Sequence, residues 1–315
     1  PEFLGIYSIA NAIILILEVL SKMGIETGIM RFVSRLNPKE DHKKIQNLIL
    51  SSFKMVFAFS IFVMALIIFL SDYIAFNLFK GDELLKKALI VFSIAIPFNS
   101  LTLVSAHATQ GFKLLKYKTI VTQFINPTIL FISAFFMIHF FSKDLTILAP
   151  TVLTSLIGFF SMSYYLKKIT RINLITYLNG SFNYDLIKFS TPLMFVTILQ
   201  TLMHWMDILM LGYYVNAETV GYYHPAVRTA GLLQALLLSF LSIYSPIFSQ
   251  FYKEKNKEKM SNIYKMVTRW LILSSLPITI IFLIFPENLM SLFGTTYVAS
   301  SSILVILTIA TFFQA

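Results

Sequence analysis

The stretch MVFAFSIFVMALIIFL, residues 55–70, contains no charged residue. It also lacks the polar stripe, repeating about every 3.6 residues, that a helix on the surface of a water-soluble bundle shows. About 20 apolar helical residues cross the hydrocarbon core of a bilayer, which is roughly 30 Å thick. We therefore interpret this stretch as the greater part of a membrane-spanning helix.

Similar apolar runs recur along the chain, such as LIVFSIAIPF at 89–98 and LILSSLPITIIFLIF at 271–285. Hydrophobic residues make up 57% of the 315 residues and charged residues 13%, about half of the charged share of a soluble domain. The sequence predicts an all-α polytopic membrane protein. Its predicted spans are 4–28, 48–70, 88–110, 119–141, 146–166, 186–213, 220–249 and 264–285, with a ninth that starts near 299.

The sequence contains little that indicates enzymatic chemistry. It has no cysteine, which excludes disulfides and thiol catalysis, and its five histidines are scattered. No Ser/His/Asp set, pair of acids or glycine-rich phosphate loop appears, and the longest predicted outer loop is only about 71–87. We therefore expect no enzyme and no metal site.

The positive charges gather in alternate loops, around Arg35, Lys116, Lys168 and Lys257, and are sparse in the other loops. Loops rich in lysine and arginine stay in the cytoplasm. Pro1 is therefore predicted on the outer side, with the first span running inward.

Three segments of the chain occur twice. PEFLGIYSIANA at 1–12 resembles AETVGYYHPAVR at 217–228, NLFKG at 77–81 resembles SLFG at 291–294, and LIVFSIAIPF resembles LVILTIATFF at 304–313. The nearly constant offset of about 215 residues indicates an internal repeat. Since this offset spans six helices, both copies enter the membrane in the same direction, as in several transporter folds.

The second copy follows the predicted span 186–213, whereas nothing precedes the first copy. We therefore expect one helix missing upstream and at least two downstream of this chain. The expected fold has two parallel six-helix lobes, incomplete at both ends. The predicted parts are an N-terminal lobe at 1–166, a basic cytoplasmic linker at 167–185 and a C-terminal lobe at 186–315.

Several of these segments resemble the polysaccharide (O-antigen-type) flippases. PEFLGIYSIA and MGIETGIMRFVSR resemble the second span of that family, STPLMF and MDILMLGYYVNAETVGYYHPAVR its seventh and eighth spans, PENLMSLFG the end of its ninth, and HATQGFKLLKY the end of its fourth. The superfamily also contains multidrug and toxin extrusion antiporters and the lipid II flippase. The resemblance implies movement of lipid-linked oligosaccharides across the cytoplasmic membrane by alternating access between two lobes.

The resemblance also sets our expectations for partners. We expect a monomeric transporter that takes a polyprenyl-pyrophosphate-linked oligosaccharide, is surrounded by membrane lipids and binds no nucleic acid. It can act together with polysaccharide assembly proteins. We expect coupling to a gradient of H⁺ or Na⁺ and no other cofactor.

Charges inside membrane spans are costly and need a reason. Asp207 and Arg228 lie on consecutive spans, both about 9–12 Å below the outer surface at 1.5 Å per residue. They either form an ion pair that joins two helices, or act as a coupling acid and a cavity cation. His204 shares a helix face with Asp207 and either extends a proton path or is merely hydrogen-bonded.

Asn11, Glu18 and Lys22 form one polar stripe on the first span, which indicates a face turned toward an aqueous interior. Lys22 and Glu26 lie near the predicted cytoplasmic edge, where water can solvate them instead. The third span also has a polar side, which fits polar packing between helices. That side contains Asn99, Thr102, Ser105, His107 and Gln110.

Lys54 and Arg269 are separated by 215 residues, the offset of the repeat. Each lies about 9 Å deep from the cytoplasmic side, estimated from the helical rise. The pair could hold the two phosphates of a lipid pyrophosphate, or each side chain could extend to the headgroups. We group Lys54, Arg269, Arg228 and Arg31 as predicted substrate-binding cations.

Four alternatives remain open. A multidrug or cation antiporter of the same superfamily needs acids facing a compact apolar cavity with few cations, and lipid II is a further cargo. A membrane-bound polymerase or ligase usually has a long outer loop with catalytic residues. A passive helical scaffold does not explain repeated charge inside the spans.

Overall fold

The computed structural model describes residues 1–36, 40–81, 83–140, 143–171 and 182–314. All regular elements within these ranges are helices, which confirms the all-α prediction. The elements are α1 (Glu2–Lys22), α2 (Ile25–Arg35), α3 (His42–Asp72), η1 (Tyr73–Leu78), α4 (Glu83–Gly111), α5 (Leu115–Thr119), η2 (Ile120–Ile125), α6 (Asn126–Phe140), α7 (Lys143–Thr170), α8 (Tyr184–Tyr214), α9 (Ala217–Lys253), α10 (Lys257–Ile284), α11 (Pro286–Ser291), η4 (Thr295–Ser300) and α12 (Ser301–Gln314).

Within the described part of the chain, seven helical segments are long and apolar enough to cross a membrane. They coincide with seven of the nine predicted spans. The other two predicted spans, 146–166 and 220–249, lie within α7 and α9. The protein is therefore a multi-pass membrane protein.

The first predicted span is wrong at its C-terminal end, because the helix does not continue from residue 4 to residue 28. It ends at Lys22, and Met23 and Gly24 adopt left-handed backbone angles, with φ of 54° and 69°. A new helix, α2, begins at Ile25. Left-handed angles suit glycine, and a side chain at Gly24 would also collide with the backbone of Ser190 on α8.

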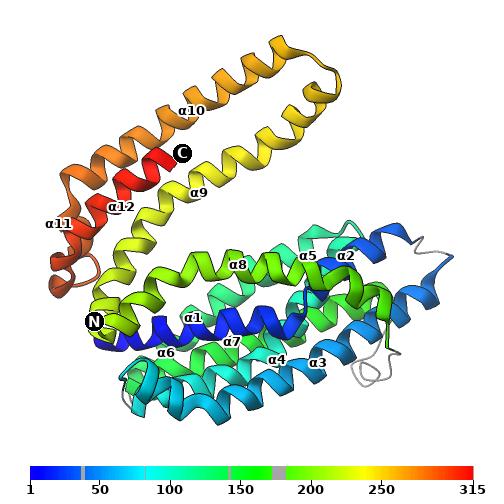
Figure 1. Ribbon diagram of the computed structural model, residues 1–315, viewed down its shortest axis with the longest axis horizontal. Helices are drawn as coiled ribbons and strands as arrows, with labels where there is room; N and C mark the ends of the chain where they lie inside the picture. The colour runs from blue at the N-terminus through cyan, green and yellow to red at the C-terminus, as the bar shows by residue number, and fades with distance from the viewer. Residues whose placement is uncertain (37–39, 82, 141–142, 172–181, 315) are drawn as a thin grey trace. The chain divides into compact units, whose positions relative to one another are not determined.

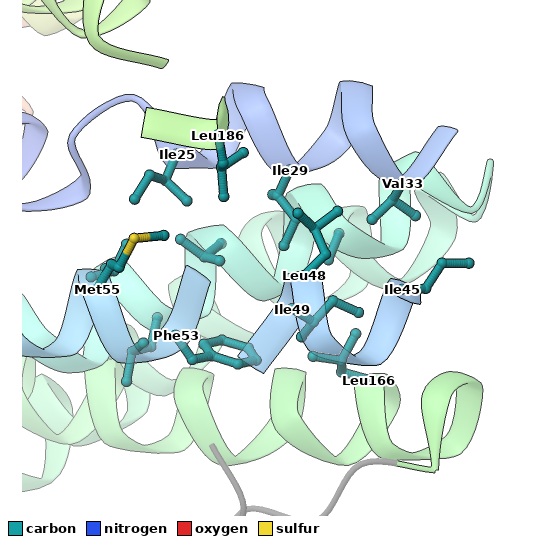
Figure 2. Close-up of a cluster of buried hydrophobic side chains, with 14 residues drawn as sticks. Ile25, Ile29, Val33, Ile45, Leu48, Ile49, Phe53, Met55, Leu166 and Leu186 are labelled. Atoms are coloured by element: carbon teal, nitrogen blue, oxygen red, sulfur yellow. The ribbon is translucent and has the colours of Figure 1, made fainter. Parts of the chain in front are cut away.

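Contacts divide the chain into two compact units, and Ile6–Ala217 form the N-terminal unit. In this unit α4 packs against α2, α3 and α7, while α8 packs against α2 (Figure 1). The core between them is apolar, with Ile25 and Ile29 of α2 pointing toward Leu48 of α3 and Leu186 of α8 (Figure 2). The part of the chain after the break, α2, is thus held by packing against α3, α4 and α8.

The C-terminal unit consists of Pro1–Gly5 and Glu218–Ala315. Its core joins α9, α10, α11 and α12 through the buried residues Ala226, Ala230, Leu233, Phe282, Met290 and Leu304. The Ser300 hydroxyl donates to the carbonyl of Tyr222 at 2.8 Å, which ties η4 to α9.

The two compact units do not share the boundary of the predicted lobes, because α8 packs with the N-terminal unit. The compact units are defined by which helices contact each other, whereas the predicted lobes are defined by the sequence repeat. A difference between the two boundaries therefore does not test the lobes, and the lobes at 1–166 and 186–315 stay a prediction. Most of the predicted linker 167–185 lies outside the described residues. Helix starts do keep the repeat offset: α1 starts at Glu2 and α9 at Ala217, α3 at His42 and α10 at Lys257.

Candidate functional site

Two charged side chains are buried together on α1. Glu18 is 3% exposed and Lys22 is 7% exposed, and 3.2 Å separates the Glu18 Oε1 from the Lys22 Nζ. Their spacing of four residues places them on one helix face. The amide of Asn99 on α4 donates to the Glu18 Oε2 at 3.4 Å. Glu18 and Lys22 thus share one face of α1 and compensate each other's charge, but both are buried beside α4, so this part of the predicted stripe does not face an aqueous interior in this structure.

Two serines let α1 approach α4 beside this ion pair. The Ser21 hydroxyl donates to the backbone carbonyl of Glu18 at 2.7 Å and lies 2.7 Å from the Ser100 hydroxyl. A hydroxyl has one proton to donate, so Ser100 donates to Ser21. Small residues of this kind allow close helix packing in membranes.

A second set of polar residues, His107, Gln110 and Lys118, links the start of α2 to α4 and α5. The His107 Nδ1 lies 3.0 Å from the backbone carbonyl of Glu26, and its Nε2 lies 2.9 Å from the Lys118 Nζ. Because an ammonium group only donates and a carbonyl only accepts, the ring carries its proton on Nδ1. Lys118 also donates to the Gln110 side chain at 3.1 Å. His107 is thus a neutral clamp with both ring nitrogens bonded.

Glu26 completes the buried group of charges. It is 6% exposed, and its Oε2 has no hydrogen-bond partner among the described residues. Its carboxyl interacts electrostatically with Lys22 and Glu18. Solvation at the membrane edge, one alternative for Lys22 and Glu26, therefore does not describe this structure.

A pocket of about 450 Å³ lies in the N-terminal unit, and Lys54 is its single charged lining residue. The other lining residues are apolar: Met23, Met55, Ala58, Phe59, Phe182 and Ile187. Lys54 itself is exposed, although it follows the fully buried Phe53. The pocket thus offers one ammonium group beside an apolar wall, which suits a ligand with an anionic head and a hydrocarbon tail.

Arg31, another predicted substrate cation, lies in the packing between α2 and α8. Its guanidinium carbon is 4.5 Å from the centre of the Phe189 ring, in a cation–π contact. The side chain is exposed, so the contact leaves the charge open to other ligands.

The remaining predicted site residues lie in both units. On α8, His204 is exposed and its ring packs edge-on against Trp205, while the half-buried Asp207 accepts a hydrogen bond from the backbone of Ile208 at 2.8 Å. On α9, Arg228 donates to the His224 ring at 3.2 Å. Since Asp207 and Arg228 belong to different units, their pairing stays a prediction.

Asn11 is half-buried on α1, and Arg269 is exposed on α10. That Arg269 faces the same space as Lys54 stays a prediction as well. Among the described residues, no group of three His, Asp or Glu side chains could hold a metal ion.

The sequence analysis missed the helix break and the contacts of Lys118, a residue of the basic loop predicted around Lys116. The signal for the break is the pair Met23–Gly24 directly after Lys22. Lys118 lies eleven residues after His107, across the turn between α4 and α5, and no helical spacing reveals that contact.

Residues 1–252 match the family of polysaccharide biosynthesis proteins, and residues 192–315 match the MatE family. None of the curated proteins matches the chain. A solved structure is similar over 99% of this chain and 74% of its own, with a TM-score of 0.75 and 13% identity. It is described as the inward-facing conformation of a multidrug resistance MATE family transporter of the MOP superfamily. At that identity the likeness shows the fold alone.

Proposed function

The chain belongs to the family of polysaccharide biosynthesis proteins, and on that basis we propose that it moves a polyprenyl-pyrophosphate-linked oligosaccharide across the cytoplasmic membrane. Transport proceeds by alternating access, driven by an ion gradient. The basic loops face the cytoplasm, and Pro1 lies on the outer side. This chain performs no enzymatic step.

The pocket around Lys54 is the observation that carries the proposal. A polyprenyl pyrophosphate combines a strongly anionic group with a long apolar chain. An ammonium group at the edge of an otherwise apolar pocket matches both parts. Lys54 also has a counterpart at the repeat offset, Arg269, whose planar guanidinium can bind phosphate oxygens in pairs.

The match of residues 192–315 to the MatE family favours a second candidate, a multidrug or cation antiporter. A cationic drug needs an acid that is not already neutralised in its pocket. The described pocket carries a lysine instead, and the buried Glu18 is already paired with Lys22. Lipid II, another pyrophosphate-linked cargo, fits the same pocket chemistry and is distinguished by the glycan it carries.

Replacing Lys54 and Arg269 together tests the proposal. In cells that express the full-length gene, Lys54→Gln with Arg269→Gln should abolish glycan export while the protein stays in the membrane. The matched control is Lys43→Gln with Lys257→Gln, which removes exposed cations from the first turns of the same two helices, α3 and α10. Export should remain normal in the control. Normal export in the first double variant would remove both residues from the mechanism.

A further inference from the structure

Glu26 differs from the other buried charged residues on α1 and α2. Glu18 and Lys22 form an ion pair with each other, and neither donates a hydrogen bond to the Glu26 Oε2. One Glu26 oxygen, Oε2, is buried without a hydrogen-bond partner among the described residues. The carboxyl also accepts a hydrogen bond from its own backbone N–H, at the start of α2. A buried carboxylate oxygen without a partner is costly. Binding of a proton removes that cost.

Opposing influences act on this carboxyl group. The N-terminus of α2 and the charge of Lys22 favour the ionised form. Burial and the charge of Glu18 favour the protonated form. A modest change of surroundings can therefore change the state of the group.

Among the described residues, the charges that act on the Glu26 carboxyl are those of Lys22 and Glu18, and the other helices packed on α2 add none. On α4, His107 is neutral and bonds the Glu26 backbone carbonyl, and Lys118 on α5 lies beyond that ring. On α3 and α8, the charged residues next to the residues that pack on α2 are Lys54, Asp185 and Lys188, and all three are exposed.

The position of Glu26 links its surroundings to movement of the helix. It lies two residues after Gly24, where α1 and α2 meet at left-handed backbone angles. Such a break can absorb a change of backbone angles, as hinges do. A shift of α2 against α1 would move Glu26 relative to Lys22, which lies on the other side of the break.

The repeat indicates that these charges are not a requirement of the fold. The second copy contains no Asp, Glu, Lys, Arg or His between Arg228 and Lys253, the segment that corresponds to Glu18, Lys22 and Glu26. Helix α9 is nevertheless formed along this segment and continues unbroken to Lys253. The charged stripe and the break therefore belong to the first copy alone.

We propose that Glu26 is the site that binds and releases the coupling proton, and that the break at Met23–Gly24 controls its access to water. This rests on the function proposed above. In this scheme the carboxyl holds the proton in the described conformation, where its Oε2 is buried without a hydrogen-bond partner among the described residues. When α2 moves and water reaches Glu26, its O–H bond breaks, the proton passes to water and the carboxylate remains. Water on the opposite side of the membrane returns a proton to the carboxylate in the alternate conformation.

Infrared spectroscopy of the purified full-length protein in nanodiscs tests the proton site without any transported substrate. A protonated carboxyl group absorbs apart from a carboxylate. At neutral pH the wild-type protein should show a band from a buried protonated carboxyl, and Glu26→Gln should lose it. The control Glu40→Gln removes an exposed acid and should keep the band. Absence of the band from the wild type, or its persistence in Glu26→Gln, would refute the proposal.

Two further variants are needed. Glu26→Asp distinguishes loss of the proton site from a folding defect, and Asp207→Asn tests the other candidate for the coupling acid. Glu26→Asp keeps an acid at this position and should keep the band at a shifted frequency, together with export. Glu26→Gln should lose gradient-driven export. If Glu26→Gln exports normally while Asp207→Asn does not, Asp207 is the coupling acid and this inference fails, although the proposed function stands. If the wild type moves no lipid-linked glycan, the proposed function fails, and the infrared result is unaffected.

Discussion

At the scale of single residues, the charged groups of the N-terminal unit are accommodated in different ways. Glu18 and Lys22 neutralise each other at 3.2 Å. Lys118 and the neutral His107 clamp the start of α2. Lys54 is exposed at an apolar pocket. Spacing alone predicted the Glu18–Lys22 stripe, because residues four apart share a helix face. Spacing could not predict the contacts of Lys118, because they depend on the turn that brings α5 beside the end of α4.

The buried ion pair predicts an unequal effect of single and double substitutions on stability. Lys22→Met leaves the Glu18 charge buried without its partner, and breaking such a pair costs about 3–5 kcal/mol of unfolding free energy. The double variant Glu18→Leu with Lys22→Met removes both charges and should cost less than the single change. Unfolding in mixed micelles with increasing SDS measures both free energies. Equal losses in the single and double variants would show that the two charges are not coupled.

At the scale of elements, the contact between α2 and α8 is unusually close. A side chain at Gly24 would collide with the backbone of Ser190. A side chain at Gly28 would collide with the Ser190 hydroxyl. These small residues allow the two helix backbones to approach, as at many membrane-helix interfaces. The apolar runs were sufficient to predict seven spans. The break was missed because an apolar run does not indicate where two residues adopt left-handed backbone angles. Packing of Gly24 against Ser190 of α8 helps to stabilise these angles.

This close approach predicts a specific cross-link. A Cβ atom built on Gly28 lies 3.5 Å from the Ser190 Cβ, a distance that a disulfide can bridge. Because the chain has no cysteine, Gly28→Cys with Ser190→Cys introduces the only possible intramolecular pair. The two cysteines should form a disulfide on mild oxidation, detected as a mobility shift that reductant reverses.

The same cross-link should stop transport if α2 and α8 move apart during the cycle. Export should fall under oxidising conditions and recover with reductant, while each single-cysteine variant exports equally in both conditions. A disulfide that forms without any effect on export would show that α2 and α8 stay together throughout transport.

At the scale of the whole molecule, the repeat and the family describe the same architecture from different evidence. Paired helices start at the common offset, Glu2 with Ala217 and His42 with Lys257. The all-helical, multi-pass fold could be predicted from the long apolar runs and the repeated segments, whereas the superfamily was implied by the resemblance of segments such as PEFLGIYSIA to a known family. The cargo could not be predicted in the same way, since a phosphate requires only a few cations and an apolar wall, which leave little pattern in a sequence.

The most direct test of the central claim is deletion of the full-length gene, followed by analysis of the lipid-linked glycans on each face of the cytoplasmic membrane. We predict that one polyprenyl-pyrophosphate-linked glycan accumulates on the cytoplasmic face, and that the wild-type gene restores its export. The variant with Lys54→Gln and Arg269→Gln should not restore it. An unchanged distribution of every lipid-linked glycan after deletion, with altered resistance to cationic drugs instead, would contradict the account and favour an antiporter.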